Sequence, residues 1–179
     1  IEGGYDTITD LGNGKDQVYV NYYGLVTATL VADWNPKDYE TYNLGQATVK
    51  TAGHNIDMSG SRTLNDTIIK YHGWNITNSG SSVGVKMVGT KFNDTLTGGA
   101  GVDNLFGGDG NDILDGGDGS DVLTGGGGAD TFLIVGGTYS TDTITDLGNG
   151  GDAFRVIGAK VIATLAADWT ADNNTFIGS

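Results

Sequence analysis

The sequence predicts an all-β protein whose chain winds into a parallel β-roll, a form of β-solenoid. Three observations support this prediction: a run of nine-residue repeats, a high glycine content, and the lack of any long 3.6-residue hydrophobic period. Glycine accounts for 32 of the 179 residues and proline for only one. An excess of glycine with almost no proline excludes collagen and favours closely stacked turns.

Five nonapeptide units follow one another between Gly89 and Leu133. Each unit has an aspartate at its sixth position and a large apolar residue at its eighth. The aspartates are Asp94, Asp103, Asp112, Asp121 and Asp130. The apolar residues are Leu96, Leu105, Leu114, Leu123 and Phe132. Because both positions keep their register through five units, each is expected to have one repeated structural role.

The unit Gly107 to Asp115 (GGDGNDILD) shows how the pattern forms a coil. Glycines at its first, second and fourth positions permit positive φ and a close approach of neighbouring turns. A three-residue strand follows, in which Leu114 points to the face opposite to that of its neighbours. Two units then complete one coil around a thin apolar core. We expect Leu96, Leu114 and Phe132 to line one wall, and Leu105 and Leu123 to line the other.

A second, longer repeat spans most of the chain. Tyr5 to Val20 returns at Thr141 to Val156, an offset of 136 residues (5 to 141). Val26 to Trp34 returns at Val161 to Trp169, an offset of 135 residues (26 to 161). The chain therefore holds about one and a third copies of a tandem unit. We interpret it as a fragment of a longer modular protein, in which neighbouring tandem units of the same chain are partners.

The parts outside the regular repeats are also predicted to be strands. Between Asn43 and Val88, the stretches ATVKT, NIDMS, TIIKY, NITN and VGVKMV are separated by Gly, Ser and Asn. Val161, Leu165 and Trp169 have helical spacing, but the β-branched residues of the earlier copy favour a strand. The predicted organisation has four parts: the end of one tandem unit with the Trp34 strand (1–42), irregular solenoid coils (43–92), the regular roll (93–137), and the start of the next unit as a capping block (138–179).

The charge distribution excludes several classes of partner. The formal net charge is −13, and residues 92–154 contain 11 Asp and no Lys or Arg. Nucleic acids and anionic membrane surfaces attract basic patches, so neither is an expected partner. No apolar run is long enough for membrane insertion, and the lack of cysteine excludes disulfides and thiolate metal sites. Since uncompensated like charges resist compaction, this stretch is either disordered or completed by a cation.

Stacking of the turns identifies the cation that fits. Asp94 would lie above Asp112 and Asp112 above Asp130, with Asp103 above Asp121 on the opposite side. A hard dication between such carboxylates turns their repulsion into attraction. Calcium takes six to eight oxygen ligands from carboxylates and backbone carbonyls, and a glycine turn offers both. Magnesium demands octahedral geometry, and zinc prefers nitrogen and sulfur ligands.

The units resemble the RTX nonapeptide family, G-G-x-G-x-D-x-U-x, whose repeats bind calcium. The resemblance covers about a quarter of the chain, most closely Gly98 to Leu133. It implies three or more calcium ions, each between turns two units apart and held by the sixth-position Asp of both turns and by turn carbonyls. The implied residues are Asp94, Gly98, Gly101, Asp103, Gly107, Gly110, Asp112, Gly116, Gly119, Asp121, Gly125, Gly128 and Asp130.

Some positions depart from the family pattern. The first unit has Thr-Lys-Phe where the family has Gly-x-Gly, and Lys91 would weaken a cation site at Asp94. Asp109 and Asp118 lie at a position that varies between units, so we expect them to be solvated. The block DTITDLGNGGD resembles segments that follow RTX runs in secreted proteins, and its acidic residues are expected either to cap the roll or to bind calcium. They are Asp142, Asp146 and Asp152.

The sequence contains no catalytic constellation, so an enzyme is not expected. The leading hypothesis is a calcium-dependent structural module of a large secreted or cell-surface bacterial protein of adhesin, surface-layer or extender type. The RTX resemblance implies type I secretion and folding on calcium outside the cell. The alternatives are an accessory module of an exported enzyme, or a module binding a glycan or a surface partner. The residues of that glycan patch would be Tyr22, Tyr23, Tyr71, His72 and Trp74, whereas Trp34 and Trp169 are predicted core anchors.

Overall fold

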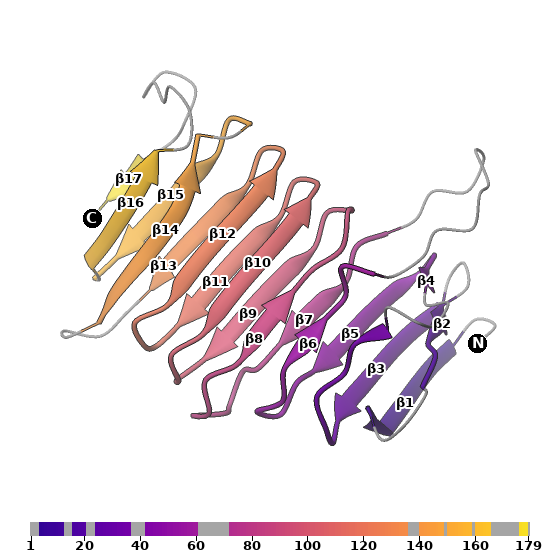
Figure 1. Cartoon of the computed structure of the whole chain (residues 1–179). Helices are drawn as coiled ribbons and strands as arrows, with labels where there is room; N and C mark the ends of the chain where they lie inside the picture. Colours follow the sequence, from indigo (N-terminus) through magenta and orange to yellow (C-terminus); the bar gives the residue numbers. More distant parts are fainter. Residues whose placement is uncertain are drawn as a thin grey trace.

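The structure, a computed structural model, is built from parallel strands (Figure 1). It describes residues 4–12, 16–20, 24–36, 42–60, 72–135, 140–148, 150–158, 160–165 and 176–178. Within this part of the chain, no helix is long and apolar enough to cross a membrane. The predicted TIIKY strand, Tyr22, Tyr23, Tyr71 and Trp169 lie outside the described residues.

The described part of the chain contains strands β1 to β17. Their bounds are β1 (Gly4–Leu11), β2 (Tyr19–Val20), β3 (Gly24–Leu30), β4 (Tyr42–Asn43), β5 (Gln46–Lys50), β6 (Ile56–Asp57), β7 (Asn75–Thr77), β8 (Lys86–Val88), β9 (Thr95–Gly99), β10 (Asn104–Asp109), β11 (Ile113–Gly117), β12 (Val122–Gly127), β13 (Thr131–Val135), β14 (Thr141–Leu147), β15 (Ala153–Ile157), β16 (Lys160–Leu165) and β17 (Phe176–Gly178). The odd-numbered strands form a nine-stranded sheet in the order β1-β3-β5-β7-β9-β11-β13-β15-β17. The strands β16-β14-β12-β10-β8-β6 form a six-stranded sheet, and β2 pairs with β4.

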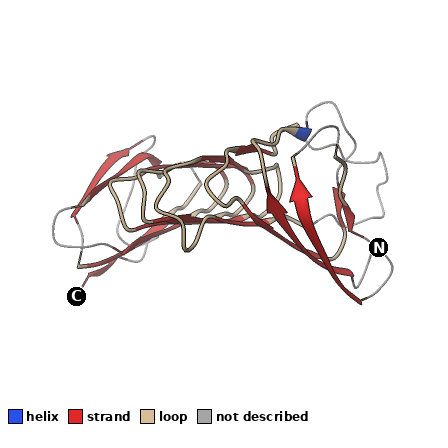
Figure 2. Ribbon diagram, turned by 90° about the horizontal axis from the view of Figure 1, so that it is seen from below, coloured by secondary structure: helices blue, strands red, loops and turns tan. Residues whose placement is uncertain are grey.

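Consecutive strands of the regular region therefore alternate between two sheets, as the predicted β-roll requires. Figure 2 shows the two sheets as layers joined by turns at both sides. Leu114 pairs with Leu96 and Phe132 in one sheet, and Leu105 pairs with Leu123 in the other. All five side chains are fully buried. The two predicted walls of the core are confirmed, because a period-2 strand directs only the eighth position of each unit inward.

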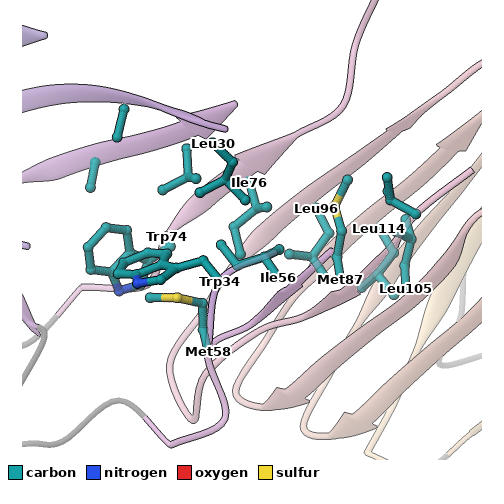
Figure 3. Packing of buried hydrophobic residues seen from close by; sticks show 14 of the residues in the cluster. Leu30, Trp34, Ile56, Met58, Trp74, Ile76, Met87, Leu96, Leu105 and Leu114 are labelled. Carbon is teal, nitrogen blue, oxygen red and sulfur yellow. The ribbon is translucent and has the colours of Figure 1, made fainter. Parts of the chain in front are cut away.

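The less regular coils join the same two sheets. β5 and β7 lead into β9, and β6 and β8 lead into β10. Larger side chains fill this wider part of the core, including Trp34, Trp74 and Met58 (Figure 3). Trp34 is a core anchor, as predicted. Trp74 is only 3% exposed, so the prediction that it forms part of a glycan-binding aromatic patch is wrong.

The long sequence repeat is also a structural repeat. β1 pairs with β3 through Asp6 and Val26, and β14 pairs with β16 through the equivalent Asp142 and Val161. Both pairs have a register shift at the same point, before the leucine that ends β1 and β14. β2 pairs with β4 in the register in which β15 pairs with β17. Strands, not helices, therefore form at Val26 and Val161, as the β-branched residues predicted.

Candidate metal sites in the turns

The ladder aspartates form two buried columns, one on each side of the roll. In each column, the backbone N–H of one aspartate donates to Oδ1 of the aspartate in the next turn on that side. The first column is Asp94, Asp112, Asp130 and Asp152, with N···O distances of 2.7, 2.8 and 2.9 Å. The second column is Asp103, Asp121 and Asp142, with distances of 2.8 and 2.9 Å. Each of these seven residues is at most 1% exposed.

Three carboxylates in the middle of the columns have one oxygen without a partner. These atoms are Oδ2 of Asp112, Asp121 and Asp130, and all three are buried. A buried carboxylate oxygen that loses water without gaining a hydrogen bond costs several kcal/mol, roughly, unless it is protonated or meets a cation. Each orphaned oxygen therefore needs either a proton or a cation.

In the carboxylates nearer to the ends of the columns, Oδ2 accepts hydrogen bonds from residues of the same turn. Oδ2 of Asp94 accepts hydrogen bonds from the Thr90 N–H and hydroxyl. Oδ2 of Asp103 accepts from the Gly99 N–H at 2.9 Å. In the last turn of the first column, the Gly148 N–H fills the same role for Asp152 at 2.7 Å. The sequence pattern did not reveal the role of Thr90, which replaces the family's second glycine.

The turns that contain an orphaned carboxylate oxygen differ in backbone conformation from the turns of Asp94 and Asp103, where both carboxylate oxygens accept hydrogen bonds. In each turn with an orphan, both the second and the fourth residue have positive φ. These glycines are Gly108, Gly110, Gly117, Gly119, Gly126 and Gly128. In the turns that end at Asp94 and Asp103, neither corresponding residue has positive φ. The left-handed glycines of the family pattern thus accompany the unsatisfied oxygen.

Backbone oxygens lie beside the orphaned carboxylates. A Cβ built on Gly107 would overlap Asp112 Oδ2 and lie 2.6 Å from the carbonyl oxygen of Gly125 in the next turn. A Cβ on Gly116 or Gly125 would likewise overlap Oδ2 of Asp121 or Asp130. The first-position glycines therefore let each carboxylate lie against the turn backbone, where any side chain would displace it. Carboxylate and carbonyl oxygens are the ligands that calcium prefers.

The remaining predicted residues occupy supporting positions. Gly98 lies between Asp103 Oδ2 and the Gly116 carbonyl, and Gly119 packs against the carbonyl oxygen of Gly101. Asp109 and Asp118, predicted to be solvated, are exposed. Among the described residues, no three His, Cys, Asp or Glu side chains cluster as a metal site.

The three aspartates of the predicted capping block take two positions. Asp142 and Asp152 extend the columns, because their Oδ1 atoms accept the N–H groups of Asp121 and Asp130. Asp146 accepts the N–H groups of Gly125 and Gly126, at 3.0 and 2.7 Å. All three therefore satisfy backbone donors of the regular roll, as a cap does. Calcium binding by these aspartates stays a prediction.

Burial also shifts the ionisation of the columns. Burial raises the pKa of Asp112 and of Asp121 to about 7, although each accepts a backbone hydrogen bond that lowers it. Repulsion from neighbouring carboxylates, such as Asp94 on Asp112, raises these pKa values further. Burial raises the pKa of Asp94 and of Asp130 to about 6. In the metal-free protein, Asp112 and Asp121 are therefore partly protonated near neutral pH.

The raised pKa values predict opposite effects of pH on the calcium-free and calcium-bound proteins. A carboxyl whose folded pKa is raised stabilises the metal-free fold at low pH, and this contribution is lost as the pH rises through about 6 to 7. Calcium competes with those protons, so its affinity should increase over the same range. We expect the calcium-induced rise in Tm to be small at pH 5 and large at pH 8. Equal rises at the two pH values would contradict this linkage.

A parallel β-roll whose turns present buried carboxylates and glycine carbonyls defines the class of calcium-binding repeat modules. Comparison with known families agrees. The RTX calcium-binding nonapeptide repeat matches this chain in four copies, over residues 86–114 and 98–132. Residues 86–132 therefore form a run of RTX calcium-binding nonapeptide repeats. No curated protein and no solved structure matches the chain.

Proposed function

We propose that this protein is a structural module that folds, or is locked, when calcium neutralises its two columns of buried carboxylates. The three orphaned oxygens of Asp112, Asp121 and Asp130 carry this proposal. They lie in turns with the left-handed glycines of the RTX pattern, and the region around them has no basic residue to offset its charge. Calcium supplies the missing positive charge and accepts the carbonyl oxygens of the turns as further ligands.

The orphaned oxygens support a proposed placement of the ions between particular turns. The pairs Asp112 with Asp130 and Asp103 with Asp121 each contain an orphaned oxygen, and we place one ion in each. Asp130 and Asp152 form a further pair, which makes three sites. By the same criterion, Asp94 with Asp112 and Asp121 with Asp142 are further candidate pairs, since each contains an orphaned oxygen.

The proposed setting is a large secreted or cell-surface bacterial protein of adhesin, surface-layer or extender type. Extracellular calcium modules bind with Kd values of roughly 10⁻⁴ to 10⁻³ M. Such sites would stay empty at the low calcium concentration inside a cell and fill outside it. This suits export of an unfolded chain followed by folding, as in type I secretion. The tandem repeat favours a stalk or scaffold over an accessory module of an exported enzyme.

A calcium titration tests the proposal. We expect far-UV circular dichroism of the full chain to gain β-signal cooperatively between chelator and about 10 mM calcium, a range that covers extracellular sites. Each independent site at about 100 times its Kd adds about 2.7 kcal/mol to stability, so Tm should rise steeply. Magnesium at the same concentration is the control and should act weakly, because it demands octahedral geometry. A spectrum and a Tm that ignore calcium would overturn the proposal.

A further inference from the structure

The strand β1 (Gly4–Leu11) ends the nine-stranded sheet, and among the described strands it pairs only with β3. Its equivalent in the structural repeat, β14, pairs on both sides: with β16 on one side and with β12, at the end of the regular roll, on the other. The two strands share the sequence Asp-Thr-Ile-Thr-Asp-Leu-Gly. The partners of β14 therefore indicate what the unpaired edge of β1 can bind.

The interface of β14 with the roll consists largely of acceptors for backbone N–H groups. Oδ1 of Asp142 accepts the Asp121 N–H at 2.9 Å, and Asp146 accepts those of Gly125 and Gly126. The hydroxyls of Thr145 and Thr124 are 2.7 Å apart. Asp142 and Ile144 become buried at this interface.

In β1 the equivalent side chains are presented to solvent. Asp6, Thr9 and Asp10 correspond to Asp142, Thr145 and Asp146, and all three are exposed. The conformation is nevertheless the same. Gly12 has φ of 101° and Gly148 of 98°, and the Gly12 N–H donates to Asp16 Oδ2 at 2.7 Å, as Gly148 does to Asp152. The β1 edge is thus already shaped for a partner.

We propose that the exposed edge of β1 is a docking surface for the last turns of a preceding nonapeptide roll, equivalent to residues 116–130 in another copy of the tandem unit. The N–H of the aspartate equivalent to Asp121 donates to Asp6. The N–H groups equivalent to Gly125 and Gly126 donate to Asp10. The roll within this chain cannot be the occupant, because β14 and β15 already cover its end. The two sheets then continue from one unit into the next without a linker.

A double-length protein tests the proposal: residues 1–136 followed directly by residues 1–179. In the natural sequence, the six residues 136–141 separate Val135 from Asp142. In the double-length protein, residue 136 and residues 1–5 of the second copy, again six residues, separate Val135 from the second Asp6. With calcium present, we expect slow hydrogen exchange at the upstream Asp121, Gly125 and Gly126 amides. Asp6→Ala with Asp10→Ala in the downstream copy should speed that exchange by about tenfold or more, as expected when hydrogen bonds to charged acceptors are lost.

The matched control is the same pair of substitutions in the upstream copy, where β1 remains exposed and neither exchange nor Tm should change. If the downstream variant folds poorly, Thr9→Val in each copy is the milder comparison, since only the downstream Thr9 would lose a hydroxyl partner. Independent melting of the two copies, or equal effects of the substitutions in both, would overturn the proposal. This test does not depend on how many calcium ions are bound, so its failure leaves the proposed function standing.

Discussion

The substitution Asp112→Asn is expected to remove the calcium response of the site at Asp112 and yet leave the calcium-free protein at least as stable at pH 8. The amide oxygen can still accept the Asp94 N–H, but the negative charge that holds calcium is gone. Burial and neighbouring carboxylates oppose ionisation of Asp112, so neutralising it relieves the metal-free fold. Loss of one site that is about 100-fold above its Kd removes about 2.7 kcal/mol of calcium-dependent stability. Thermal melting with calcium and with chelator measures both effects.

Asp118→Asn is the matched control, because Asp118 is an exposed aspartate of the same roll. It changes the net charge equally but should leave the calcium response intact. If both variants lowered the calcium response alike, calcium would be acting through general charge screening, and the site at Asp112 would be ruled out. A loss of stability in chelator alone would show that Asp112 only satisfies the Asp94 backbone.

Gly128→Ala should be the most damaging substitution of a turn residue. Gly128 has φ of 127°, a conformation that costs an L-residue roughly 1–2 kcal/mol. A Cβ at this position would also overlap the carbonyl oxygen of Gly110 in the adjacent turn. The stacked turns would have to separate, and the candidate site between Asp112 and Asp130 would open. We expect a destabilisation of at least about 3 kcal/mol and a weaker calcium response, measured by urea unfolding at fixed calcium.

Gly80→Ala separates the two causes. Gly80 also has positive φ, at 86°, but nothing lies within 4 Å of a Cβ built on it. This variant should cost only the conformational strain, roughly 1 kcal/mol, and keep its calcium response. Equal losses in the two variants would show that backbone strain alone decides the outcome, and that the turns of the roll have room to relax.

The regular roll could be predicted from the sequence because each of its residues has a local reason for its place. The period of nine fixes the alternation of Leu105 and Leu114 between two walls. The columns beyond Asp130 were harder to see, because the next members follow at longer intervals, from Asp121 to Asp142 and from Asp130 to Asp152. Only the sheet pairing shows that these longer loops return to the same columns.

The environment of individual side chains was the second property that could not be predicted from the sequence. All five ladder aspartates look alike in the repeat, but the fold leaves Asp112 with an orphaned oxygen and closes Asp94. That difference depends on turn dihedral angles, which a glycine permits but does not dictate. Trp74 was misassigned for a similar reason. Its neighbours are polar and aromatic, and nothing local shows that a wide coil buries its ring.

The two copies of the structural repeat lie in different sheets. β1 and β3 belong to the nine-stranded sheet, whereas the equivalent β14 and β16 belong to the six-stranded one. One copy thus advances the chain by an odd number of strands, from β1 to β14. A fibre made of such units would have a two-unit screw symmetry, in which each unit is rotated by half a turn from the last. A surface feature on one side of a unit would then lie on alternating sides of the fibre from one unit to the next.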